Sequence, residues 1–140
     1  MDRIFVAALF LGISAAGAFA SPHKDAIAKF YEYRTQMLGP RGSEADVDGL
    51  LALFANDSSY EHPQFGVSMN KTEARRGMVA HLREGKDVSF RVHRIREGNG
   101  FAIAEVTFGY VVNEKEIVRT GVTIFEFNGN KLERVAEYGQ

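Results

Sequence analysis

Residues 46–63 read DVDGLLALFANDSSYEHP, and their hydrophobic pattern changes from helical to extended partway along. The first part has apolar side chains at the i, i+3, i+4 and i+7 spacing of an amphipathic helix, namely Val47, Leu50, Leu51 and Phe54. We expect Asp46 to cap this helix and Asn56-Asp57 to end it, because these residue types tolerate the backbone geometry of helix ends. Residues 58–62 then predict a short extended segment, which a loop follows.

A further helix is expected on each side of this stretch. Upstream, residues 22–38 carry one apolar helical stripe, made of Ile27, Phe30, Tyr31 and Met37. Ser21 is a candidate cap for that helix, and residues 39–43 end it because they hold two glycines and a proline. Downstream, Asn70 followed by Glu73 predicts a capping box. The third helix that it starts is expected to bury Ala74, Met78, Val79 and Leu82.

From residue 87 onward the pattern alternates as strands do. Val88, Phe90 and Val92 share one face of a first strand. Turn-forming residues then separate three further strands, at 101–112, 117–127 and 132–138. Three helices followed by a four-strand antiparallel meander predict an α+β fold, with the helices on one face of a curved sheet. Because helices cannot cover the whole face of such a sheet, a pocket between the layers is expected.

The first twenty residues are predicted to be a signal peptide. Basic Arg3 precedes an almost wholly apolar or small stretch, residues 4–17, and Ala18-Phe19-Ala20 has the small-x-small form of a cleavage site. The alternative is an uncleaved membrane anchor, but the apolar run is shorter than the ~20 residues that a span needs. We therefore expect a mature domain at 21–140 that is periplasmic or secreted and does not contact the membrane after cleavage.

Composition excludes several other classes of protein. The chain has 140 residues, 45% of them hydrophobic, and a formal net charge of −1, which argues against disorder and against nucleic acid as a partner. The absence of cysteine excludes disulfides and thiolate chemistry. The four histidines lack metal-ligand spacing, and no phosphate loop or dinucleotide fingerprint occurs, so neither a metal nor a cofactor is expected. His81 and His93 are expected at the surface.

Several stretches together resemble one known superfamily. Residues 46–57 and 60–63, with TIFEFNG at 123–129 and RVAEY at 134–138, are similar to the SnoaL-like and steroid delta-isomerase branches of the nuclear-transport-factor-2-like superfamily. The resemblance implies a cone-shaped α+β barrel of the cystatin-like kind, whose curved sheet wraps a helix and encloses a mostly apolar cavity. It also implies a homodimer through the sheet. It does not imply one activity, because the same cone serves enzymes and binding proteins.

The steroid isomerase residues of that family are not conserved in this chain. The position of the general-base aspartate matches His62, that of the oxyanion tyrosine most nearly matches Phe30, and that of the oxyanion aspartic acid matches Thr123. Steroid isomerisation needs a base and strong hydrogen-bond donors at these places, and a phenylalanine donates none. We therefore do not expect this activity.

The sequence nevertheless predicts a pair of polar side chains inside this cavity. If His62 points into the cone, strand alternation directs Tyr60 the same way. Val135 and Glu137 share a face of the last strand, which the resemblance makes the concave one. A Glu137 carboxylate bonded to one ring nitrogen would orient His62 as a general base. The alternative is structural: His62 is a pocket-wall residue, and Glu137 pairs with a buried arginine such as Arg34.

Three alternative functions are compatible with such a cone. The first is binding of a small apolar or aromatic molecule, and the second is an enzyme in which His62, oriented by Glu137, catalyses isomerisation, cyclisation or hydration of such a molecule. The third is an oligomerisation module whose cavity is filled by its own side chains. The ligand-binding residues predicted for the first function are Phe30, Tyr60, Phe108, Tyr110, Thr123, Phe125 and Val135. A cavity of roughly 300 Å³ or more would distinguish the first two from the third.

Overall fold

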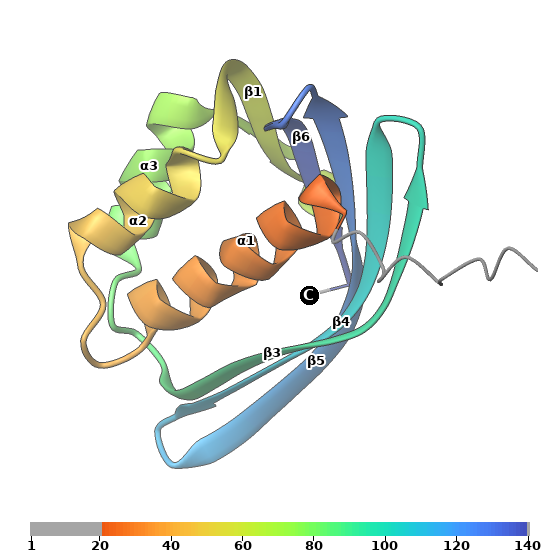
Figure 1. Cartoon of the computed structure of the whole chain (residues 1–140). Coiled ribbons are helices and arrows are strands. Elements are labelled where there is room, and N and C mark those ends of the chain that lie inside the picture. Colours follow the sequence, from red (N-terminus) through yellow and green to blue (C-terminus); the bar gives the residue numbers. More distant parts are fainter. Residues whose placement is uncertain (1–20, 140) are drawn as a thin grey trace, which may run out of the picture.

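The computed structural model describes residues 21–139, in which three α-helices pack against a curved sheet (Figure 1). The predicted signal peptide at 1–20 lies outside the described residues. The helices are α1 (Pro22–Leu38), α2 (Glu44–Leu51) and α3 (Lys71–Ala80). The strands are β1 (Phe54–His62), β2 (Val67–Asn70), β3 (Lys86–Gly98), β4 (Phe101–Val112), β5 (Lys115–Asn128) and β6 (Lys131–Tyr138), and a 3₁₀ turn (Pro63–Phe65) joins β1 to β2. No helix within 21–139 has the length and apolar character to cross a membrane.

The sheet confirms the predicted meander and adds two strands to it. Its strand order within the described chain is β2-β1-β6-β5-β4-β3. Neighbouring strands run antiparallel, except that β1 pairs in parallel with β6, where Tyr60 lies opposite Val135. In Figure 1, α1 crosses the concave side of the sheet, and α2 and α3 lie together beside it. The predicted α+β cone is therefore confirmed.

Helix α1 forms where the apolar stripe predicted it. Ser21 occupies the N-cap position and Pro22 the first turn, although the Ser21 hydroxyl makes no capping bond to the helix. The buried face includes the four predicted apolar residues and also Arg34. A charged side chain on a buried stripe needs a partner inside the protein, and this requirement shapes the candidate site described below.

The second helix differs from its prediction at both ends. It begins after Ser43, and Asp46 is not the cap but the third helical residue, whose carboxylate accepts a hydrogen bond from the Ser43 N–H at 2.9 Å. It ends at Leu51, so Asn56 and Asp57 lie inside β1. The reason is long-range pairing. Phe54 lies opposite Leu132 of β6, and this pairing extends the chain although Phe54 continues the helical period.

The start of α3 agrees with its prediction, whereas the segment after β1 differs from its prediction. The Asn70–Glu73 capping box of α3 is present, with the Glu73 N–H donating to the Asn70 side chain at 2.9 Å. The segment predicted as a loop after His62 contains the 3₁₀ turn and then β2, which pairs with β1 from Ser59 opposite Asn70 to His62 opposite Val67. β2 was not predicted because it has only four residues, which are mostly exposed and follow a proline and a glycine typical of a loop.

The loop between α1 and α2 is packed tightly against the end of α1. The N–H of Gly42 donates to the Gly39 carbonyl at 3.1 Å, and this brings Gly42 close to Met37. A Cβ atom on Gly42 would lie 2.1 Å from the Met37 carbonyl oxygen and 2.6 Å from its carbon. Backbone atoms cannot move aside as a side chain can, so the close approach requires glycine here.

We predict that Gly42→Ala lowers the free energy of unfolding by about 1–3 kcal/mol, the cost of overpacking. The matched control is Gly77→Ala, because nothing lies within 4 Å of the added Cβ in the middle of α3. It should raise stability by about 1 kcal/mol through helix propensity. Urea unfolding of both variants measures the two changes, and a Gly42→Ala protein as stable as the parent would contradict the packing described.

Candidate functional site

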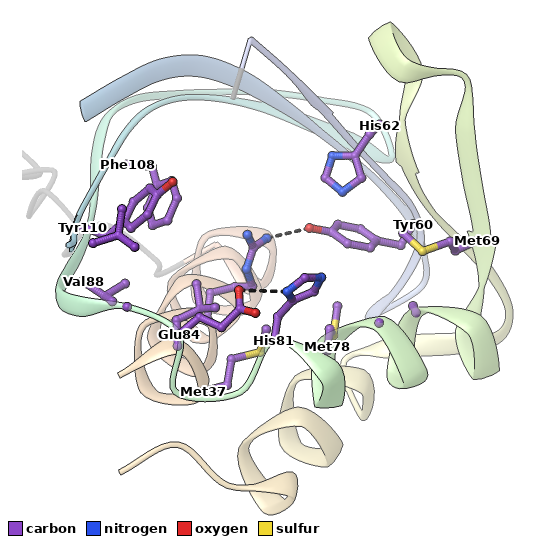
Figure 2. Close-up of a pocket in the computed structure, with 16 residues that line it drawn as sticks. Met37, Tyr60, His62, Met69, Met78, His81, Glu84, Val88, Phe108 and Tyr110 are labelled. Carbon is purple, nitrogen blue, oxygen red and sulfur yellow. Dashed lines mark hydrogen bonds and ion pairs between the residues drawn. The ribbon is translucent and has the colours of Figure 1, made fainter. Parts of the chain in front are cut away.

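A pocket of about 820 Å³ opens between the concave sheet, the C-terminal half of α1, and α3 (Figure 2). Its apolar wall comes mainly from Met37, Leu38, Met69, Ala74, Met78, Val88, Phe108 and Val112. Its polar lining comes from Arg34, Tyr60, His62, His81, Glu84 and Tyr110. A mostly apolar hollow with a few polar groups is the usual form of a small-molecule site.

The deepest part of the site is an ion pair between α1 and β6. Nη1 of Arg34 lies 2.6 Å from Oε1 of Glu137, and the two side chains are only 11% and 1% exposed. The same Nη1 donates to the Tyr60 hydroxyl at 2.6 Å, so β1 is joined to the pair. Burial acts to lower the pKa of Arg34, but the charge and hydrogen bond of Glu137, together with Tyr60 and Tyr31, outweigh this effect and raise that pKa above its ordinary value.

Tyr60 is held as a neutral phenol beside this pair. Burial raises the pKa of Tyr60 well above the ordinary tyrosine value, and the nearby Glu137 carboxylate raises it further, although Arg34 acts in the opposite direction. The inner end of the pocket therefore presents a fixed cation and an uncharged hydroxyl, and the carboxylate paired with the cation lies behind them. Arg34 also lies over the Phe90 ring, with its Cζ 5.1 Å from the ring centroid, which favours a cation in this apolar setting.

His62 projects from the end of β1 into the pocket, and Figure 2 shows its ring above Tyr60. Its Nδ1 lies 3.7 Å from Oε2 of Glu137, and the His62 side chain is 28% exposed. This distance exceeds that of a direct hydrogen bond. Oε2 of Glu137 is buried and has no hydrogen-bond partner among the described residues. The carboxylate thus uses one oxygen for Arg34 and keeps the other next to His62.

An aromatic wall forms the side of the pocket built by β3 and β4. The rings of Phe90 and Phe108 stack with centroids 4.5 Å apart and planes 12° apart. Tyr110 continues the stack on Phe108 at 4.8 Å and 19°. Phe108 and Tyr110 of this stack line the pocket and give it aromatic surface that suits an apolar or aromatic molecule.

The structure divides the residues predicted from sequence into two groups. Tyr60, His62, Phe108 and Tyr110 line the pocket, and Glu137 lies directly behind Arg34. The remaining four predicted ligand-binding residues do not line it, and each is fully buried: Phe30, Thr123, Phe125 and Val135.

The physical reason is the position of α1. Phe30 of that helix packs edge-to-face on Phe125 with centroids 5.2 Å apart, and the neighbouring Tyr31 hydroxyl donates to Thr123 at 2.9 Å. The helix therefore fills the part of the cone that these residues would otherwise expose to a ligand.

Several lining residues were missed by the sequence reasoning. Met69 was missed together with β2, and Arg34 was considered only as a structural partner of Glu137. The position of Arg34 could have been predicted, because it falls on the same buried helical stripe as Phe30, Tyr31 and Met37. His81 is 63% exposed, as expected for a surface residue, but it also lines the pocket mouth with Glu84, which is 57% exposed, and these lining positions were not predicted. His93 is a surface residue as expected, with Nε2 2.6 Å from the Thr107 hydroxyl. No three metal-ligating side chains gather anywhere in residues 21–139.

We predict that Glu137→Leu lowers the free energy of unfolding by about 3–5 kcal/mol, because it leaves the buried Arg34 charge without its partner. The double variant Arg34→Met, Glu137→Leu should be more stable than Glu137→Leu alone, since no charge is then buried. Glu84→Leu at the exposed mouth is the control and should change stability by less than about 1 kcal/mol. Urea unfolding tests the set, and additive losses in the double variant would contradict the coupling.

Comparison with solved structures identifies the same fold in other proteins. A hypothetical protein with a ketosteroid isomerase-like fold from Catenulispora acidiphila, in complex with trimethylamine, superposes with a TM-score of 0.67 at 14% identity, covering 81% of this chain and 84% of its own. An LEH-like epoxide hydrolase of M. tuberculosis gives 0.66 at 15% identity, with coverages of 83% and 80%. TerC, co-crystallised with polyporic acid, gives 0.66 at 14% identity, with 86% and 92%. Likeness at this identity shows a shared fold.

The family comparison is consistent with this likeness. No curated protein matches the chain. The model of the SnoaL-like domain matches residues 27–135, from the first buried turn of α1 to the middle of β6. That span includes the whole pocket lining, from Arg34 to Val112. The chain therefore belongs to the SnoaL-like domain family.

Proposed function

We propose that this protein binds a small, mainly apolar or aromatic molecule in the pocket between α1, α3 and the sheet. The observation that carries the proposal is the pocket itself, because its volume of about 820 Å³ lies within the range of roughly 300–1,000 Å³ typical of ligand sites. Its walls supply apolar and aromatic surface, and its inner end supplies hydrogen-bonding groups. A cavity filled by the protein's own side chains would not leave this volume, so the pocket argues against a purely oligomerising role.

The related structures support the same idea. TerC was co-crystallised with polyporic acid and the Catenulispora protein was in complex with trimethylamine, so cones of this fold hold small molecules. A homodimer through the sheet and export through cleavage after Ala20 stay predictions. The convex face does carry exposed apolar side chains, among them Phe101 and Val118, which such a dimer would cover.

We predict that the purified protein binds 2-naphthol and 4-phenylphenol, two flat apolar phenols of different length. Phe108→Ala removes part of the stacked wall and should weaken this binding several-fold, up to about tenfold, since an aromatic contact contributes about 0.5–1.5 kcal/mol beyond its buried area. The control is Val118→Ala on the convex face, which should bind as the parent does. Calorimetric titration measures the affinities. Absence of binding, or an equal loss in both variants, would contradict the proposal.

A second candidate function is proton transfer to His62. The observation that favours it is the buried Oε2 of Glu137, which lies 3.7 Å from Nδ1 of His62 and has no other partner among the described residues. With Nδ1–H directed to this carboxylate, Nε2 would accept a proton from a bound molecule or from water. Tyr60 and Arg34 would place polar hydrogens next to the charge that develops. Base-catalysed forms of isomerisation, cyclisation and hydration use such a step.

Exchange of the α-protons of 2-tetralone with D₂O tests this function, because the ketone is flat, apolar and a weak carbon acid. The protein should accelerate exchange, and His62→Gln should lose about 100-fold or more of the acceleration while its affinity for 2-naphthol stays within about twofold. His93→Gln, a histidine outside the pocket, is the control. Proton NMR follows the exchange. If the parent does not accelerate it, or if His62→Gln is as active, His62 is not the base.

A further inference from the structure

The pocket has a second polar group at its mouth, made by His81 and Glu84. His81 is the C-cap residue of α3, Glu84 follows in the loop to β3, and both line the pocket. Their side chains are 63% and 57% exposed, in contrast to the buried pair at the inner end. In Figure 2, His62 comes from β1 on one side of the pocket, and His81 comes from the end of α3 on the other. Polar groups therefore occur at two depths.

The ring of His81 is oriented by Glu84. Nδ1 of His81 lies 2.8 Å from Oε2 of Glu84, which makes this nitrogen the donor to a carboxylate. In the neutral ring Nε2 is then an acceptor. No hydrogen-bond partner for Nε2 occurs within residues 21–139, so this nitrogen is available to a molecule in the pocket. Exposed ion pairs contribute only about 0–1 kcal/mol to stability, so folding alone does not require this one.

The loop that carries both residues is held rigidly against α1. The N–H of Arg83 donates to the Met37 carbonyl and that of Gly85 to the Leu38 carbonyl, both at 3.0 Å. The Arg83 guanidinium donates to the Gly42 carbonyl at 2.8 Å. Arg83 itself has a φ of 62°, in the left-handed region that non-glycine residues rarely adopt. Such strain costs about 1–3 kcal/mol and persists only where the surroundings fix it, often at ligand sites.

Apart from its polar groups, the pocket lining is apolar and includes Met37, Met78, Val88 and Phe108. A ligand hydroxyl placed there would lose its hydrogen bonds to water without compensation, whereas one at either end would find a partner. The inner partners are Arg34, Tyr60 and His62, the outer one is Nε2 of His81, and Tyr110 adds a hydroxyl on the β4 side of the lining.

From this arrangement we infer that the pocket takes an elongated apolar molecule with a hydroxyl group at each end, and that His81 binds the outer hydroxyl. The inference rests on the proposed binding function and narrows its ligand class. A hydroxyl fits the outer end because it donates to Nε2, while a carboxylate there would be repelled by Glu84. His81 is a binding residue, and Glu84 is a positioning residue that acts through it.

Matched pairs of probes test the inference. 2,6-Dihydroxynaphthalene is compared with 2-naphthol, and 4,4′-dihydroxybiphenyl with 4-phenylphenol, so that each pair differs by one hydroxyl and the two pairs differ in length. In at least one pair, the second hydroxyl should tighten binding about three- to tenfold, as one added hydrogen bond does. His81→Ala should remove this gain and leave the affinity for the monohydroxy probe within about twofold.

Two further variants complete the experiment. Glu84→Gln keeps an acceptor oxygen near Nδ1 and should retain part of the gain, whereas His93→Ala, outside the pocket, should retain all of it. The inference is overturned if neither dihydroxy probe binds more tightly than its partner, or if the gain survives His81→Ala. In that case the monohydroxy probes still bind, and the proposed function stands. If no probe binds at all, both proposals fail.

Discussion

The ion pair between Arg34 and Glu137 is the constraint on which the site depends. A buried charge is tolerated only beside its partner, so α1 can lie in the cone only where Arg34 meets β6. That requirement sets how deep the helix enters. It leaves Phe30 and Phe125 packed on each other on one side of the pair, and an open pocket on the other. The hollow is thus bounded by an electrostatic contact as much as by the bend of the sheet.

The two oxygens of Glu137 also reconcile two interpretations that the sequence had left as alternatives. One oxygen binds Arg34, which is a structural role, and the other faces His62. A single carboxylate therefore serves the fold and remains available to orient a histidine.

Local patterns in the sequence predicted the parts of the fold that depend on local forces. The stripe of α1, the capping box of α3 and the turns of the meander are all specified within a few residues. The end of α2 was missed because Phe54 is drawn into a strand by Leu132, far along the chain. Strand alternation placed Tyr60 and His62 inside the cone but could not tell that Val135 is fully buried and does not line the pocket. The sequence could not predict that His81 and Glu84 line the pocket, because long-range backbone hydrogen bonds from their loop to α1 place them at its mouth.

The position of β6 in the sheet has a consequence for how the chain is made. The last strand of the sequence lies between β1 and β5, and it is the only hydrogen-bonded link between the β1–β2 pair and the β3–β5 meander among the described strands. While the polypeptide is still emerging from the ribosome, the two halves of the sheet have no shared edge, and Arg34 has no carboxylate to meet. The barrel therefore cannot close until β6 has been synthesised and inserts between β1 and β5.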